Sequence, residues 1–82
     1  SKTYVINTDL YVRDEPQGNK LKMDALTENA KAHAYFDSEG YAILKGKTKV
    51  TCLSIKELDN STWMRIPSGW VCARNEEKVY IE

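Results

Sequence analysis

The segment 63–71, Trp-Met-Arg-Ile-Pro-Ser-Gly-Trp-Val, constrains the fold more than any other part of the chain. Met64 and Ile66 alternate with Trp63 and Arg65, so a strand here has one apolar face and one face with an aromatic ring beside a cation. The Pro-Ser-Gly that follows is typical of a tight turn, since proline fixes φ and glycine accepts a positive φ. The segment therefore predicts a β-hairpin and a small all-β domain.

Length and charge limit the possibilities further. Eighty-two residues form one domain, 1–82, with a core only just large enough for stability. Twelve cationic and twelve anionic side chains cancel, which disfavours a nucleic-acid binder because such proteins carry a basic excess. No apolar run has the length of a membrane span, so we expect no membrane partner. The chain starts at Ser1 without methionine, so we expect a fragment of a longer protein. We also expect the domain to be a monomer.

The two cysteines, Cys52 and Cys72, do not have metal-site spacing, and His33 is the only histidine, so we expect no metal and no cofactor. Strand alternation places Cys52 inward with Val50 and Cys72 outward. This parity argues against a disulfide and predicts two reduced thiols.

The first half of the chain predicts two further β elements. After a short strand at 4–6, Leu10 and Val12 alternate with Tyr11 and Arg13, which predicts a strand with the aliphatic residues inward. The Asp-Glu-Pro-Gln-Gly segment at 14–18 ends it. Segments 31–36 and 41–44 predict a hairpin closed by the loop 37–40, with Tyr35 and Tyr41 on either side of the tip.

Between these elements, residues 19–30 have no regular period. We expect an irregular loop with one helical turn at 25–28, capped by Asp24 and tucked over a barrel opening by Leu21 and Leu26.

The second half predicts a long strand over 48–55, a polar connection at 56–62 that turns at Asp59-Asn60, and the hairpin of 63–71. A polar loop at 73–78 and a short last strand at 79–81 complete the chain. Five to seven short strands at this spacing indicate a small antiparallel barrel or sandwich.

Three segments together resemble the bacterial Src-homology-3-like (SH3b) family. Residues 10–16 (LYVRDEP) resemble its leading LNVRxxP, residues 44–51 (LKGKTKVT) its LxxGxxVxV centre, and Trp63 with Gly69-Trp70-Val71 its closing WxxV…GWV. The departures are Tyr11 in place of asparagine and a longer stretch between Gly18 and Ile43. The resemblance implies an SH3-like antiparallel barrel with an inserted hairpin at about residues 19–43.

Members of this family are usually appended to cell-wall hydrolases, amidases and phage lysins. The resemblance therefore implies a non-catalytic module that binds peptidoglycan or an associated wall polymer and targets an attached amidase, muramidase or peptidase. It also implies an extracellular location at the cell wall, or release at lysis if the protein is phage-encoded.

An enzyme is disfavoured by the residues themselves. The carboxylates lie mostly in lysine-containing loops rather than as an acid/base pair, and nothing indicates a lowered thiol pKa beside His33.

Binding is better supported, because exposed aromatic rings contact sugar rings and peptide stems while polar neighbours orient their hydroxyls and carboxylates. The candidate ligand-binding residues are Tyr11, Arg13, Tyr35, Tyr41, Trp63 and Arg65. Two alternatives remain open at this level: Trp63 can support the core, and Arg13 can pair with Asp14 or Glu15. We expect Trp70 to be half-buried packing, and Tyr4 and Tyr80 to fasten the termini.

A second class of function uses the same aromatic groove. It could hold an extended or proline-rich peptide, or the domain could serve as an intramolecular spacer against its neighbour. The domain that adjoins this segment in the parent protein would discriminate between these functions.

Overall fold

The structure is a computed structural model that describes residues 1–82. It confirms an all-β fold, with a 3₁₀ turn and one short helix. In chain order the elements are β1 (Lys2–Val5), β2 (Leu10–Tyr11), η1 (Met23–Ala25), α1 (Glu28–Lys31), β3 (Ala34–Phe36), β4 (Ala42–Leu44), β5 (Lys49–Cys52), β6 (Ser54–Leu58), β7 (Ser61–Ile66) and β8 (Gly69–Arg74).

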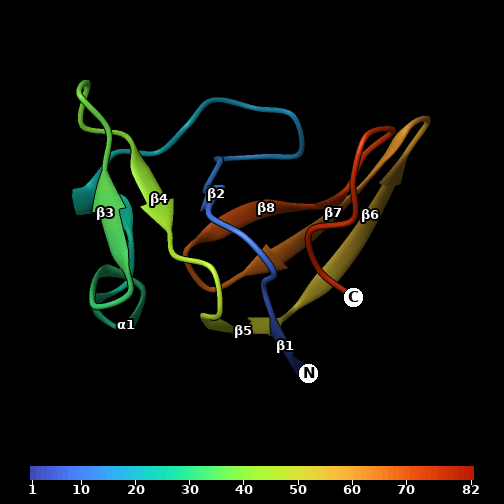
Figure 1. The fold of residues 1–82 in the computed structure, drawn as a ribbon, viewed down its shortest axis with the longest axis horizontal. Helices are drawn as coiled ribbons and strands as arrows, with labels where there is room; N and C mark the ends of the chain where they lie inside the picture. The colour runs from blue at the N-terminus through green and yellow to red at the C-terminus, as the bar shows by residue number, and fades with distance from the viewer.

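The strands form three small antiparallel sheets, with orders β1-β5, β2-β4-β3 and β6-β7-β8. Figure 1 shows the β3–β4 hairpin on one side of the molecule, the long β6-β7-β8 meander on the other, and β2 between them. The expected hairpin at 31–44 is confirmed in its strands, β3 and β4.

Single bridges connect the three sheets without closing them into one continuous barrel. The amide N–H groups of Arg13 and Trp70 each donate to the other residue's carbonyl at 2.8 Å, which connects the end of β2 to β8. Ile6 bridges to Ile81 and so joins the two ends of the chain. Residues 79–81 therefore make isolated bridges rather than the strand expected from their sequence.

The hairpin of 63–71 is confirmed as β7 and β8. Met64 and Ile66 are buried on the core side, as the alternation predicts. Gly69 has φ = 153°, and a Cβ added there would lie 2.6 Å from the carbonyl oxygen of Arg13. Glycine therefore serves two purposes here: it permits the backbone conformation and the close approach of β2 to β8.

The core is a single apolar cluster between the sheets. It draws on the inward positions predicted for the first strand, Leu10 and Val12, together with β4, β5, β7 and β8. Its members are Ile6, Leu10, Val12, Leu26, Ala42, Leu44, Val50, Met64, Ile66, Val71, Ala73 and Ile81. Tyr4 and Tyr80 pack against its edge, in agreement with their expected role near the termini.

The irregular segment before the hairpin differs from the expectation in its helical turn. The turn at 25–28 capped by Asp24 is wrong: Asp24 lies inside η1, and Thr27 caps α1 by accepting a hydrogen bond from the Ala30 amide. A threonine hydroxyl at this position satisfies an amide that the helix leaves unpaired. The expected packing of the leucines is confirmed, because Leu26 is buried and Leu21 packs against the core, although the sheets close no barrel for them to cover.

The strand expected over 48–55 is interrupted. Leu53 separates β5 from β6, and its amide donates to the Arg65 carbonyl at 2.7 Å. The polar connection expected at 56–62 is wrong at both ends, since β6 continues to Leu58 as an edge strand with Lys56 and Glu57 exposed, and β7 already begins at Ser61. Charged residues are common on such edges because they discourage further strand pairing. The turn at Asp59-Asn60 is confirmed.

Candidate functional site

Several of the predicted binding residues line a groove of about 300 Å³ on the outer surface. We call this the aromatic groove. It is lined by Asp9, Leu10, Tyr11, Arg13, Trp63, Cys72, Asn75 and Tyr80.

Strand register brings these residues together. Tyr11 and Arg13 are two residues apart, so they share the outward side of the first strand, and Arg13 pairs with Trp70 on β8. Trp63 on β7 lies opposite Cys72 on β8. The reciprocal Arg13–Trp70 hydrogen bonds therefore place the outward side of β2 beside the outward side of the β6-β7-β8 sheet.

Trp63 is part of the groove but is not an exposed platform. Its side of β7 is the one opposite Met64 and Ile66, as predicted, yet the residue is only 6% exposed. The indole Nε1–H donates to the Ser61 hydroxyl at 2.9 Å, which satisfies the buried ring nitrogen. Trp63 therefore combines the two roles considered for it: it is packed into the protein as a support for the core, and its small exposed part lines the groove.

Arg13 has no ion pair. The alternative that it pairs with Asp14 or Glu15 is wrong, because its Nη1 donates to the Gly18 carbonyl at 3.0 Å and the chain's one salt bridge joins Lys31 to Glu28. Its other guanidinium N–H groups have no partner within the chain. They are available to a carboxylate or hydroxyl in the groove.

Tyr11 and Tyr35 lie on either side of Ile43 in the β2-β4-β3 sheet. The Tyr11 hydroxyl donates to Asp37 at 2.9 Å, and the Tyr35 hydroxyl donates to Asp9. These hydrogen bonds raise the pKa of both phenols above their ordinary value. Tyr35 does not line the groove itself, but it fixes the carboxylate of Asp9, which does.

The same two hydrogen bonds act on the carboxylates. The bond from Tyr35, followed by the Gly46 amide, lowers the pKa of Asp9. At Asp37, desolvation raises the pKa, but hydrogen bonds from the amides of Tyr41 and Glu39 and from Tyr11 outweigh it, and the net pKa is lowered. Both carboxylates therefore stay ionised at neutral pH.

Two lysines contact the aromatic rings. Lys20 Nζ lies 3.9 Å from the ring centroid of Tyr11, and Lys22 Nζ lies 4.3 Å from that of Tyr41, both cation–π distances. These lysines were not among the predicted site residues, although their two-residue spacing across a strand-like segment is a usable signal.

Tyr41 and Arg65 lie outside the groove. Tyr41 packs under Lys22 at the base of the hairpin turn. Arg65 is exposed on β7, where it lies opposite Trp70 of β8. Its Nε donates to the Ser54 hydroxyl at 3.1 Å. Trp70 is half-buried, as expected.

The groove also contains residues that are not among those predicted from the sequence. The Asn75 amide donates to the Tyr80 hydroxyl at 3.3 Å, which places both polar groups at the groove wall. Both cysteines are free thiols. Cys72 points into the groove, where burial raises its pKa and its Sγ donates to the Arg74 carbonyl. No three side chains of His, Cys, Asp or Glu gather as a potential metal-binding set.

Comparison with known proteins gives no relative: no family model, no curated protein and no solved structure matches the chain. None of its helices has the length and apolar character needed to span a membrane.

Proposed function

We propose that this domain is a non-catalytic binding module whose aromatic groove holds a bacterial cell-wall polymer, peptidoglycan or a polymer attached to it. The observation that supports this most is the convergence of Tyr11, Arg13 and Trp63, three of the residues selected from the sequence, on one groove.

The chemistry of the groove suits such a ligand. Edges and faces of aromatic rings make CH contacts with sugar rings and peptide stems, and the free N–H groups of Arg13 can orient a carboxylate. Asn75 and the Tyr80 hydroxyl add neutral polar groups to the lining. A fixed Asp9 carboxylate accepts hydrogen bonds from ligand hydroxyls.

The proposal includes the family resemblance. We interpret the three sheets as a partly open SH3-like barrel; this is supported by the connection of β2 to β8 through Arg13 and Trp70 and of the chain ends through Ile6 and Ile81. In this interpretation η1, α1 and the β3–β4 hairpin are the insertion. The module would be attached to a cell-wall hydrolase and act outside the cell or at lysis.

Purified peptidoglycan sacculi test the proposal, in a pull-down performed before and after removal of secondary polymers. We expect retention of the domain and loss of most of it in the Arg13→Gln variant, which removes the guanidinium together with its hydrogen bond to the Gly18 carbonyl. Arg65→Gln is the matched control, because it removes the same charge outside the groove.

Each outcome has a distinct meaning. Retention on bare sacculi supports peptidoglycan, and retention that disappears on stripping supports a secondary polymer. Absence of retention on both preparations, with a folded domain, overturns the proposal and favours a peptide partner or a spacer role.

A further inference from the structure

A second cleft, of about 250 Å³, lies on a different part of the surface. Its polar lining comes from the α1 region, the segment leading into β5, β5 itself and the β7–β8 turn: Thr27, Asn29, His33, Thr48, Lys49, Thr51 and Ser68. We call it the polar cleft. It shares no residue with the aromatic groove.

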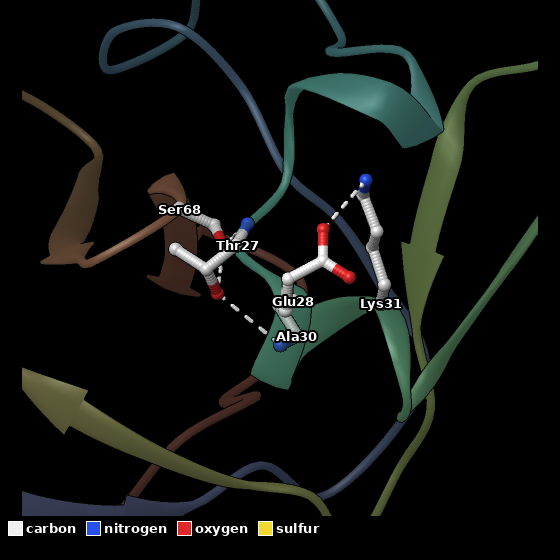
Figure 2. A network of polar contacts seen from close by, with 5 residues as sticks. All are labelled: Thr27, Glu28, Ala30, Lys31 and Ser68. Carbon is white, nitrogen blue, oxygen red and sulfur yellow. Dashed lines mark hydrogen bonds and ion pairs between the residues drawn. The ribbon is translucent and has the colours of Figure 1, made fainter.

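Hydrogen bonds hold the walls of the polar cleft in place. The Thr27 amide donates to the Ser68 hydroxyl at 3.0 Å, and the two hydroxyls are 3.1 Å apart (Figure 2). Thr27 also caps α1 through the Ala30 amide, and Lys31 pairs with Glu28 on the same turn. The Lys45 amide donates to the His33 carbonyl at 3.0 Å. The cleft is therefore preformed, which lowers the ordering cost of binding.

The lining combines an apolar floor with a rim of donors. Leu44, Val50 and Ile66 are core members that leave only a small apolar surface at the base of the cleft, and Ala30 and Pro67 line it beside them. The side chains of Asn29, His33, Lys49 and Thr51 line the rim and make no hydrogen bond within the chain. No Asp or Glu lines the cleft, so the Lys49 ammonium has no carboxylate partner there.

These features select one class of ligand. A lysine without a carboxylate partner in a cleft that also has apolar lining fits a carboxylate attached to a small aliphatic group, and the hydroxyls and Asn29 fit the amide groups of a peptide. A sugar ring is a poorer match, since no Phe, Tyr or Trp lines the cleft to stack on it. A single lysine is also too little charge for a nucleic-acid backbone.

We propose that the polar cleft binds the C-terminal carboxylate of a short peptide with small aliphatic side chains. Lys49 pairs with the carboxylate, and the last one or two side chains rest on Leu44, Val50 and Ile66. The volume limits the bound part to about two small residues, because it lies below the range of about 300–1,000 Å³ typical of drug-sized ligands. This site does not depend on the wall-binding role of the aromatic groove.

The test is an NMR titration of the isotope-labelled domain with acetyl-Ala-Ala as the free acid, compared with the same peptide as its C-terminal amide. We expect the acid to shift the amide signals of Asn29, Lys49 and Ser68 and to leave those of Tyr11 and Asn75 in place. The amide should bind about tenfold or more weakly, as should Lys49→Gln, because a charge-assisted hydrogen bond is lost.

Lys47→Gln is the matched control, since Lys47 is exposed nearby but does not line the cleft, and it should bind the acid like the unchanged domain. Equal affinity for acid and amide, absence of shifts at about 100-fold excess of peptide, or shifts confined to the aromatic groove would each overturn the proposal. Signal dispersion in the same spectra checks that every variant is folded. Lys49→Gln should keep full retention on sacculi, so failure here is distinguishable from failure of the groove.

Discussion

The hydroxyl of Tyr11 donates a hydrogen bond of 2.9 Å to Asp37, across 26 positions of the chain. Asp37 also accepts from the amides of Glu39 and Tyr41, so a single carboxylate holds the β3–β4 turn closed and connects it to β2. This relationship fixes one end of the aromatic groove to the hairpin and makes that connection dependent on charge.

We therefore expect stability to fall at low pH. The folded-state pKa values of Asp37 and Asp9 lie below the unfolded value of about 3.9. The two carboxylates thus stabilise the fold fully above that pH, and their contribution is lost as the pH falls through the folded pKa. Urea unfolding between about pH 2 and 7 measures it, with free energies of unfolding that decrease below about pH 4.

Two variants test whether Asp37 causes the loss of stability at low pH: Asp37→Asn is the test and Asp24→Asn is its control. Asparagine at 37 retains an acceptor without the charge, so the acid-dependent loss should become smaller. Asp24 makes no side-chain hydrogen bond, so the free energy of unfolding of its variant should fall at low pH as it does in the unchanged protein. Identical pH profiles for Asp37→Asn and the unchanged domain would contradict the role assigned to this carboxylate.

The free energy of unfolding is also expected to fall at alkaline pH. The pKa values of Tyr11 and Tyr35 are raised by their hydrogen bonds to Asp37 and Asp9. Their contribution is fully present below the unfolded value of about 10 and is lost as the pH rises through the folded pKa. Chemical unfolding from about pH 8 to 11 should show this decline, and Tyr11→Phe with Tyr35→Phe should flatten it.

Trp63→Ala is expected to reduce stability as well as binding. Removing a buried tryptophan costs about 3–5 kcal/mol, a large part of the roughly 5–15 kcal/mol that stabilises a typical domain. Ser61→Ala should cost about 1–3 kcal/mol, because it leaves the buried indole N–H without its acceptor. Thermal and urea unfolding measure both effects. If Trp63→Ala melts like the unchanged domain, the ring is not packed as described.

Gly69→Ala should destabilise the domain more than Gly40→Ala. Both glycines have positive φ, which costs an alanine about 1–3 kcal/mol in strained regions. At Gly69 the added Cβ would also lie 2.6 Å from the Arg13 carbonyl oxygen, whereas at Gly40 its nearest neighbour is the Lys22 side chain at 3.7 Å. Comparison of the two free energies of unfolding isolates the close approach of β2 to β8. Equal losses would contradict that contact.

The part of the fold that sequence predicts well is the part set by local alternation. Leu10 to Arg13 and Met64 to Ile66 have the predicted inward and outward sides because a strand repeats every two residues. The approximate place of the groove followed from these sides, which brought Tyr11, Arg13 and Trp63 together.

The alternation of side chains along a strand does not predict which other segments of the chain cover a residue. Trp63 lies on the outward side of its strand, yet neighbouring segments bury it. Long-range contacts were equally inaccessible: Lys20 over the ring of Tyr11 and Thr27 as the helix cap, hydrogen-bonded to Ser68, depend on how the loop 19–33 folds back. That loop has no period of its own, so its path is set by tertiary contacts.

The Thr27–Ser68 contact leads to a final prediction about local stability. Ser68→Ala removes the acceptor of the Thr27 amide and one hydroxyl partner, while Thr27 can still cap α1. Because these groups are exposed, we expect a global loss at the lower end of the roughly 0.5–1.5 kcal/mol range for a hydrogen bond. Hydrogen exchange should be faster at Thr27 and in α1, with β7 unchanged. Ser38→Ala, at an exposed turn serine whose side chain makes no hydrogen bond, should leave all of these rates as they are, and unchanged exchange in Ser68→Ala would show that the Thr27–Ser68 contact does not hold the α1 region.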